Sequence, residues 1–206
     1  MEFSLVVLLY AEKRLDQALS MARFLATQAS PRRCVFVING SEIRESLVRS
    51  RWPAALPAEI IHHDNTGAEF GGYQLGLECL GGELPDRLIV MNDTVGSHDV
   101  TSHLVLNAFL RRLKLDLNRF VVGQTYESQR RMSIHDLWAS RWIRTHFFGL
   151  DRAALTAIGS RIYHPHIDAL ITASPDVETF FGPAVRGGLR DLLVDFLFNP
   201  GPWSWY

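Results

Sequence analysis

The sequence predicts an α/β fold, in which a mostly parallel sheet is flanked by helices, and two observations lead to this prediction. Short, continuous apolar runs recur along the first half of the chain, as expected of buried strands. Between these runs lie segments whose apolar residues recur at helical spacing. Strands that alternate with helices in this way form parallel sheets with right-handed crossovers.

Four strands are expected in the first half of the chain. Each corresponds to a short apolar run, and the four runs cover residues 3–10, 34–38, 59–62 and 87–91. The third run is the weakest of them. Each run is followed by polar residues, which are typical of the loops that lead from a buried strand into a helix.

Helices are expected in the intervals between these strands. The first ends at Ser30-Pro31 and carries an apolar stripe formed by Leu15, Ala18, Leu19, Ala22 and Leu25. A short polar helix is expected before the prolines at 53 and 57. The helix after the third strand ends at Gly81-Gly82, and its stripe consists of Phe70, Tyr73, Leu77 and Leu80. Residues 104–113 form the next helix, with Ser102 as its N-cap.

The second half of the chain is less regular. Residues 120–123 and part of 142–150 are each compatible with a strand. Asp151 is expected to cap a short helix that stops at Gly159, and a last amphipathic helix is expected over 187–198. The chain ends in NPGPWSWY, and because no repeat or linker is found, we expect a single domain over 1–206.

Composition excludes several classes of protein. The chain has a formal net charge of -1 and no long run of one sign, which argues against a nucleic-acid partner. Cys34 and Cys79 have the surroundings of ordinary buried thiols, which fits a reducing cytoplasm. No apolar stretch is long enough to span a bilayer, and the first run resembles a strand and not a signal peptide. We therefore expect a cytoplasmic protein whose attachment to a membrane would be peripheral.

Polar loops follow three of the predicted strands. They are Tyr10-Ala11-Glu12, Asn39-Gly40-Ser41 and Asn92-Asp93-Thr94. Ligands of open α/β sheets bind beyond the carboxyl ends of the strands, so these loops are expected to outline one cleft. The stretch HHDNTGAEFGGYQLGL, which starts at His62, joins them, and the beginning of its helix offers free N–H groups to a phosphate. Each loop is also a common turn former, and Gly72 and Gly76 could instead allow close packing of the helix on the sheet.

Asp93 is a candidate ligand for Mg²⁺ or Mn²⁺. These ions bind one or two carboxylates together with substrate phosphates, and a strand end leaves room for both. A second carboxylate at either neighbouring position of an Asp-x-Asp pattern is missing, because Met91 and Val95 stand there. Of the eight histidines, His146 is kept as a possible late ligand for metal or phosphate because it lies in an apolar strand. No nucleophile elbow, P-loop or dinucleotide fingerprint is found.

Taken in order, these segments resemble a known family. SLVVLLYAEKR, CVFVINGS, HHDNTGAEFGGYQLGL and DRLIVMNDTVGS are similar to the nucleotide-sugar-binding half of GT-A fold glycosyltransferases, which is Rossmann-like. Family 2 enzymes and the rhamnan and capsular polysaccharide synthesis proteins are the most similar. THFFGLDRAALTAIG resembles the strand and helix after their acceptor region. The resemblance implies a nucleotide-sugar-binding half over 1–103 and an acceptor-side half over 104–206.

The resemblance also implies roles for individual residues. Asn65 and Gly67 would line the nucleotide-sugar cleft, with Tyr10 in the first loop beside them, and Asn39 would lie near the base or ribose. Asn92 and Asp93 would stand at the diphosphate and the metal. Family 2 enzymes usually carry an aspartate after the second strand and two in the metal motif, where this chain has Asn39 and a single Asp93. A weaker metal site, a metal-free site and a lost activity are all compatible with these departures.

An inverting sugar transfer also needs a general base for the acceptor hydroxyl. Chain order in the resembling enzymes points to Asp176 or Glu178 in SPDVETFF. The alternative is that these acids cap or solvate the start of the last helix.

Two functions follow as hypotheses. The first is a glycosyltransferase of surface polysaccharide synthesis, which uses Mn²⁺ or Mg²⁺ and moves a sugar from a nucleotide sugar to a glycan or lipid-linked acceptor. The second is a non-catalytic binding or interaction module of the same fold, for which the aromatic tail would offer a protein contact such as a homodimer interface. An unrelated α/β nucleotide-binding protein ranks third.

Overall fold

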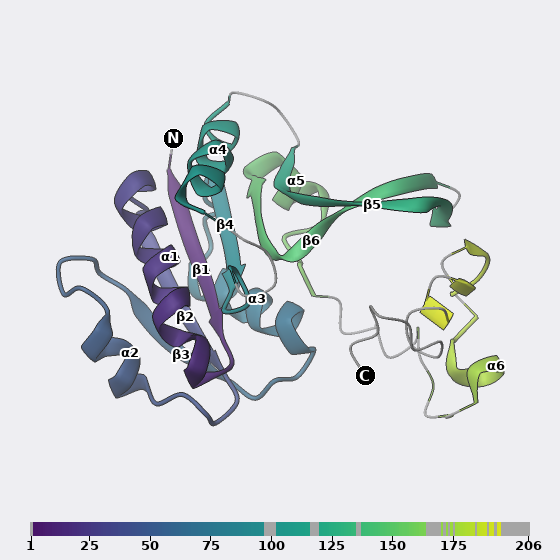
Figure 1. Cartoon of the computed structure of the whole chain (residues 1–206), viewed down its shortest axis with the longest axis horizontal. Coiled ribbons are helices and arrows are strands. Elements are labelled where there is room, and N and C mark those ends of the chain that lie inside the picture. The colour runs from purple at the N-terminus through teal and green to yellow at the C-terminus, as the bar shows by residue number, and fades with distance from the viewer. Residues whose placement is uncertain are drawn as a thin grey trace. The chain divides into compact units, whose positions relative to one another are not determined.

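The structure is a computed structural model, and its central element is a six-stranded sheet with the strand order β3-β2-β1-β4-β6-β5 (Figure 1). It describes residues 2–96, 102–115, 120–134, 137–163, 170, 172, 174, 176–183, 185–188, 190–191 and 193–194, with only the backbone for 126, 128–134 and 137–142. The strands are β1 (Phe3–Leu9), β2 (Arg33–Asn39), β3 (Glu59–His63), β4 (Arg87–Asn92), β5 (Val121–Ile134) and β6 (Leu137–Asp151).

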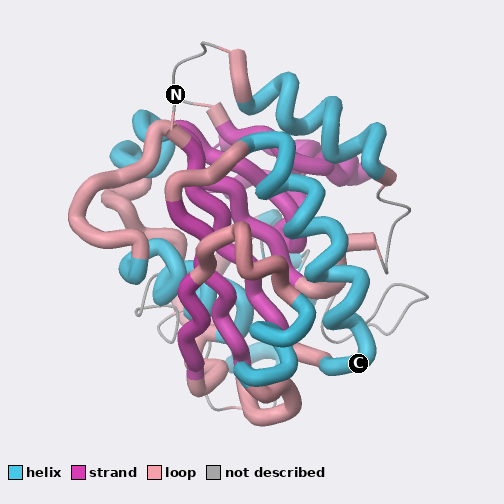
Figure 2. Tube along the Cα trace, turned by 90° about the vertical axis from the view of Figure 1, so that its left-hand side faces the viewer, coloured by secondary structure: helices cyan, strands magenta, loops and turns pink. Residues whose placement is uncertain are grey.

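The first four strands pair in parallel, and β6 runs antiparallel to β4. The predicted α/β fold with a mostly parallel sheet is therefore confirmed. Figure 2 shows the strands side by side with helices around them. The helical elements are η1 (Glu12–Arg14), α1 (Leu15–Ala29), α2 (Glu45–Arg51), α3 (Ala68–Cys79), α4 (His103–Leu113), α5 (Arg152–Ala157) and α6 (Val177–Phe180).

Two predicted helix caps are present. The Ser102 hydroxyl accepts a hydrogen bond from the Val105 N–H at 3.4 Å at the start of α4. The Asp151 carboxylate accepts one from the Ala154 N–H at 2.7 Å at the start of α5. Both side chains satisfy backbone donors that have no partner within the first helical turn.

The second half differs from expectation in the length of β5 and β6. These strands contain 14 and 15 residues, whereas the sequence predicts short strands at 120–123 and within 142–150. The extension of β5, QTYESQRRMSI, is mostly polar, and that of β6, LWASRW, is interrupted by Ser140 and Arg141. A continuous apolar run is the signal of a strand buried on both faces, and neither extension contains one.

The chain forms two compact units. The first comprises Met1–Gln124 and Ile143–Tyr163, and the second Thr125–Trp142 and His164–Tyr206. The single domain over 1–206 stays a prediction. Of the predicted last helix, 189, 192 and 195–198 lie outside the described residues, as does the tail over 199–206. Among the helices that the structure describes, none combines the length and the apolar character needed to cross a membrane.

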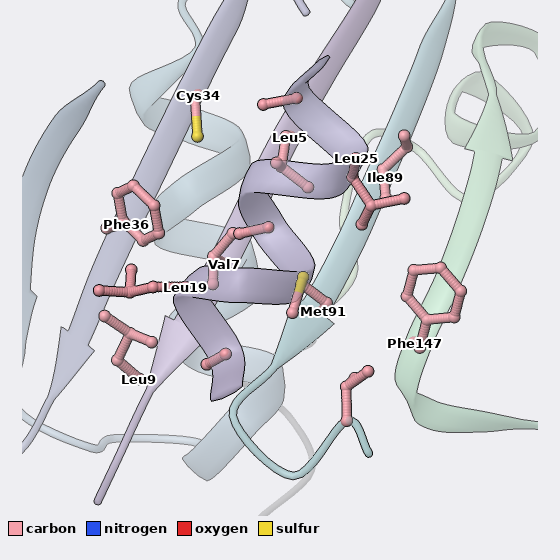
Figure 3. Close-up of a cluster of buried hydrophobic side chains, with 14 of the residues drawn as sticks. Leu5, Val7, Leu9, Leu19, Leu25, Cys34, Phe36, Ile89, Met91 and Phe147 are labelled. Carbon is pink, nitrogen blue, oxygen red and sulfur yellow. The ribbon is translucent and has the colours of Figure 1, made fainter. Parts of the chain in front are cut away.

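The sheet of the first unit is covered by apolar side chains on both faces. One cluster lies between the sheet and helices α1 and α4, and Figure 3 shows its centre with Leu5, Val7, Phe36, Ile89 and Met91. A second cluster lies under α3 and α5 and contains Val6, Leu8, Val37, Val90 and Phe148. Successive residues of β1 from Leu5 to Leu9 alternate between the two clusters, which explains why this run is continuously apolar.

Glycines let α3 lie close to the sheet. A Cβ at Gly72 would lie 2.5 Å from Leu8 Cδ1, and one at Gly76 would lie 2.4 Å from Val6 Cγ1. Both distances are far inside van der Waals contact, so any larger residue would push the helix away. Gly72 and Gly76 therefore allow close packing of α3 on the sheet, which is one of the two roles that the sequence left open for them.

Arg87 is a buried cation that caps the end of α4. Its Nε donates to the Leu113 carbonyl at 2.9 Å and its Nη2 to the Leu115 carbonyl at 3.1 Å. The third donor, Nη1, reaches the Asp86 carbonyl at 2.9 Å, and the guanidinium lies 4.9 Å from the centre of the Phe120 ring. A cation at this position satisfies carbonyl groups that the helix leaves unpaired.

Substitution Arg87→Lys is expected to lower the free energy of unfolding by about 1–2 kcal/mol. An ammonium group lacks the planar fork that reaches the three carbonyls together. Urea denaturation measures the difference, and Arg112→Lys on the exposed face of α4 is the matched control, with a change within about 0.5 kcal/mol. Equal losses in the two variants would contradict the capping role.

Candidate functional site

The candidate site lies at the carboxyl ends of β1, β2 and β4. From β1 the chain first continues to one side of the sheet, where β2 and β3 lie. It then returns to the other side of β1, where β4 lies, so the direction of strand order switches between β1 and β4. Open α/β sheets bind their ligands at such a switch point. Tyr10, Asn39, Asn92 and Asp93 all stand at this edge, as their positions after the predicted strands led us to expect.

Asp93 ties the end of β1 to the end of β4. Its side chain is fully buried, and its Oδ2 accepts hydrogen bonds from the Tyr10 N–H at 2.9 Å and the Ala11 N–H at 2.7 Å. Its Oδ1 has no hydrogen bond, and the Arg14 Nη1 lies 3.6 Å away. The carboxylate thus holds the first loop through one oxygen, and its other oxygen forms an ion pair with Arg14 but no hydrogen bond.

Asn39 connects the ends of three strands. Its Oδ1 lies 2.6 Å from His63 Nδ1 at the end of β3, and its Nδ2 donates to Asn65 Oδ1 at 2.5 Å. A side-chain hydrogen bond also links it to Tyr10 after β1. Asn39 is 3% exposed, so its amide is used within the protein. Asn39 is therefore placed to position the side chains of Tyr10 and Asn65.

Tyr10 keeps its proton over the neutral range. Burial, together with the charges of Glu69 and Asp93, raises the pKa of its hydroxyl to about 12, although the hydrogen bond with Asn39 opposes the shift. A hydroxyl with this pKa is a hydrogen-bond donor at neutral pH. Its ring is only half-buried, which leaves aromatic surface at the site.

Asn92 is both a turn residue and a member of the site. Its Oδ1 accepts hydrogen bonds from the Thr94 N–H at 3.0 Å and the Thr94 Oγ1 at 2.6 Å, which closes the turn after β4. Its Nδ2 donates to Glu69 Oε2 at 2.8 Å, in the first turn of α3. The amide therefore joins β4 to the start of α3, and both of its ends are occupied.

The loop into α3 has an unusual backbone. Asn65, Gly67 and Ala68 have positive φ angles of 72°, 70° and 50°. The Asp64 carboxylate steadies this loop by accepting from the Thr66 N–H at 2.9 Å, and this contact lowers the pKa of Asp64. A Cβ at Gly67 would lie 2.6 Å from the ring of Tyr163. Gly67 is thus the N-cap of α3 and is packed against an aromatic ring.

His146 lies at the same edge of the sheet. The last paired residues of β4 and β6 are Met91 and Phe147, and one more step along both strands leads to Asn92 and His146. Alternation along β6 puts His146 on the α3 side, with Phe148. Tyr73 of α3 donates its hydroxyl proton to the carbonyl of the preceding residue, Thr145, at 3.0 Å. The proposed role of His146 as a ligand stays a prediction.

Among the residues that the structure describes, no three His, Cys, Asp or Glu side chains lie together in a way that could hold a metal ion. The Oδ1 of Asp93 is buried and lacks a hydrogen bond, so it fits a single ligand position. The role of Asp93 in metal binding stays a prediction.

Asp176 and Glu178 lie in the second compact unit. Asp176 caps the four-residue α6, where its carboxylate accepts from the Glu178 N–H at 3.1 Å. Glu178 forms an ion pair with Arg190 at 3.1 Å. Asp176 thus caps α6, a short helix that the sequence did not predict, and not the helix predicted over 187–198. The role of either acid as a general base stays a prediction.

Three residues of the site were missed in the sequence. His63 ends β3, Glu69 opens α3, and Arg14 follows the first loop. Their positions after a strand or at a helix start can be seen in the sequence, but their partners cannot. His63 pairs with Asn39, 24 residues away, Glu69 with Asn92, 23 residues away, and Arg14 with Asp93, 79 residues away.

Comparisons with known proteins give similarities of fold. No family model and no curated protein matches the chain. The 4-diphosphocytidyl-2C-methyl-D-erythritol synthase from Anaerococcus prevotii is 11% identical over 77% of this chain and 75% of its own, with a TM-score of 0.49. The inositol-1-phosphate CTP transferase from T. maritima is 10% identical over 78% and 74%, with a TM-score of 0.46. S. aureus TarS is 15% identical over 84% and 52%, with a TM-score of 0.44.

Proposed function

We propose that the chain is a glycosyltransferase whose sheet edge binds a nucleoside diphosphate sugar. One observation carries the proposal: polar side chains from the ends of β1, β2 and β4 and from the start of α3 meet at the switch point of the sheet. Such an edge is where open α/β sheets bind nucleotides. The acceptor proposed with it is a glycan or a lipid-linked glycan of surface polysaccharide synthesis.

The hydrogen bonds divide the site residues into two groups. Asn39, Asn92 and Asp93 are buried and are engaged within the protein, so we assign them the positioning of the loops. Asn65 is exposed and Tyr10 is half-buried, so these two can contact the donor directly. The ring of Tyr10 offers a surface for the base, and aromatic stacking of this kind tolerates any base.

A divalent cation in this arrangement would have two protein ligands. The Oδ1 of Asp93 would hold it, and His146 is the second ligand proposed. Magnesium and manganese sites with few carboxylates take their remaining ligands from phosphates and water. When bound, such an ion neutralises charge on the leaving diphosphate.

In the proposed reaction, an acceptor hydroxyl oxygen bonds to the anomeric carbon, and the bond from that carbon to the diphosphate breaks. The hydroxyl proton passes to a general base, for which Asp176 and Glu178 remain the proposed residues. The diphosphate leaves with the electron pair of the broken bond. Arg14, which is 29% exposed beside Asp93, is a cation that can receive this charge.

The test is calorimetry with UDP, GDP, dTDP and CDP, each with Mn²⁺ and with chelator, followed by assays for release of the nucleotide from its sugar. Binding with turnover supports the transferase. Binding without turnover of any donor, in the presence of candidate acceptors, supports the non-catalytic binding module instead. No binding under any condition contradicts both.

Replacement of Arg14 by glutamine is expected to weaken binding of the nucleoside diphosphate about tenfold at low salt. The loss removes a positive charge that faces the diphosphate. Lys13→Gln is the matched control, since Lys13 is exposed in the same turn, and a change of less than about threefold is expected there. Equal effects of the two substitutions would show a general charge effect and contradict a specific contact by Arg14.

A further inference from the structure

The outer face of α4 carries a stripe of exposed side chains. Leu104, Ala108, Arg111, Arg112 and Leu115 recur at i, i+4, i+7, i+8 and i+11, so they share one side of the helix and of the turn that follows it. Leu104 is 80% exposed and Leu115 is 41% exposed. A shallow hollow of about 420 Å³ runs along this outer stripe. The opposite side of α4 packs into the core through Leu106, Phe109, Leu110 and Leu113.

The charge of this segment has a single sign. Residues 102–115 contain three basic side chains, Arg111, Arg112 and Lys114, and no acidic one. The chain as a whole is nearly neutral, so the basic character is local. Lys114 turns toward α1, where its ammonium group lies 3.5 Å from the Gln28 carbonyl. The two arginines therefore supply the charge of the outer stripe.

Because the outer stripe combines leucines with arginines, a partner that covers it must offer both apolar contacts and negative charge. A second copy packed about a two-fold axis would bring four arginines into one interface, and residues 102–115 offer no acidic side chain to pair with them, so like charges would oppose association. A bilayer with anionic headgroups offers both kinds of contact that the stripe needs. Leucines enter the headgroup and acyl boundary, while arginine stems lie along it and keep their guanidinium groups at the phosphates.

We infer that the outer stripe of α4 docks the protein on the surface of an anionic lipid membrane. The inference goes beyond the proposed function and does not depend on it, because the stripe contains none of the donor-site residues. Each basic residue near an anionic surface adds to membrane affinity, and exposed leucines add the apolar part. Attachment of this kind is peripheral and reversible.

The test is co-sedimentation of the full chain with vesicles of phosphatidylcholine alone and of phosphatidylcholine with phosphatidylglycerol. The wild type is expected to bind the anionic vesicles at least about tenfold more tightly, and added salt is expected to weaken this binding. Leu104→Glu with Leu115→Glu is expected to abolish binding. Arg111→Glu with Arg112→Glu is expected to reduce it about tenfold or more.

The control exchanges the same number of charges elsewhere, with Arg44→Glu and Arg161→Glu, both exposed in the first unit. Circular dichroism of each variant checks that its fold is kept. Equal binding to neutral and anionic vesicles, no binding, or equal losses in the control pair would overturn the inference. A change of oligomeric state on light scattering in the leucine variant, with vesicle binding unchanged, would assign the stripe to a copy of the chain and would also overturn it.

Discussion

Replacement of Asp93 by alanine is expected to lower the free energy of unfolding by about 2–4 kcal/mol and to abolish binding of nucleoside diphosphates. The substitution leaves the Tyr10 and Ala11 N–H groups without their acceptor at a buried position. The first loop then loses its link to β4, and the donor site loses its shape. Urea denaturation and calorimetry measure the two effects.

Two further substitutions separate the roles of this carboxylate. Asp93→Asn keeps an oxygen that can accept from the two backbone groups but removes the charge, so stability is expected to fall less than in the alanine variant. If a cation binds at Asp93, the asparagine variant also loses any dependence of nucleotide binding on Mn²⁺. Asp86→Ala is the control at the other end of β4, because the half-buried Asp86 accepts a hydrogen bond from a single backbone N–H group, that of Glu2. A stability of the alanine variant equal to that of wild type would contradict the account of Asp93.

Replacement of Gly71 by alanine is expected to cost about 1–3 kcal/mol of stability and to weaken nucleotide binding strongly. A Cβ at this position would lie 1.9 Å from the Thr66 carbonyl oxygen, so the backbone of the loop that carries Asn65 must move. Alanine normally favours a helix over glycine by about 1 kcal/mol, which makes a net loss a clear sign of the clash.

The control for this substitution is Gly82→Ala. No atom lies within 4 Å of a Cβ built at Gly82, and the residue follows the same helix. Thermal unfolding and calorimetry are expected to leave this control close to wild type. A Gly71 variant that binds nucleotide as wild type does would mean that the loop adapts, and that its backbone does not shape the site.

The sequence predicted the parallel part of the fold well because the signal there is local. β1, β2 and β4 are buried on both faces, whereas the edge strand β3 is partly exposed, which fits its weaker apolar run. Each of the four runs ends within two residues of the observed strand end. The full length of β5 and β6 escaped prediction because the extension of β5 is mostly polar and that of β6 is interrupted by Ser140 and Arg141. Pairing between strands, and not apolar content, defines them.

The site could be predicted in place but not in detail. The rule for strand ends brought Tyr10, Asn39 and Asp93 to one edge, and the structure confirms that position. What the sequence could not show is which oxygens are already used. Asp93 bonds to backbone groups 83 and 82 residues earlier in the chain, and no spacing in the sequence encodes such a contact.

The most direct test of the donor site is a titration of ¹⁵N-labelled protein with UDP, GDP, dTDP and CDP, followed through its backbone amide resonances. The account predicts that one of these nucleotides shifts the amides of Tyr10, Ala11, Asn65 and Glu69 together, at the ends of β1 and β3 and the start of α3. Resonances of Phe3 and Arg87, which pair at the amino ends of β1 and β4 on the opposite edge of the sheet, are expected to stay unchanged. Shifts confined to other elements, or no shift with any of the four nucleotides, would contradict the account.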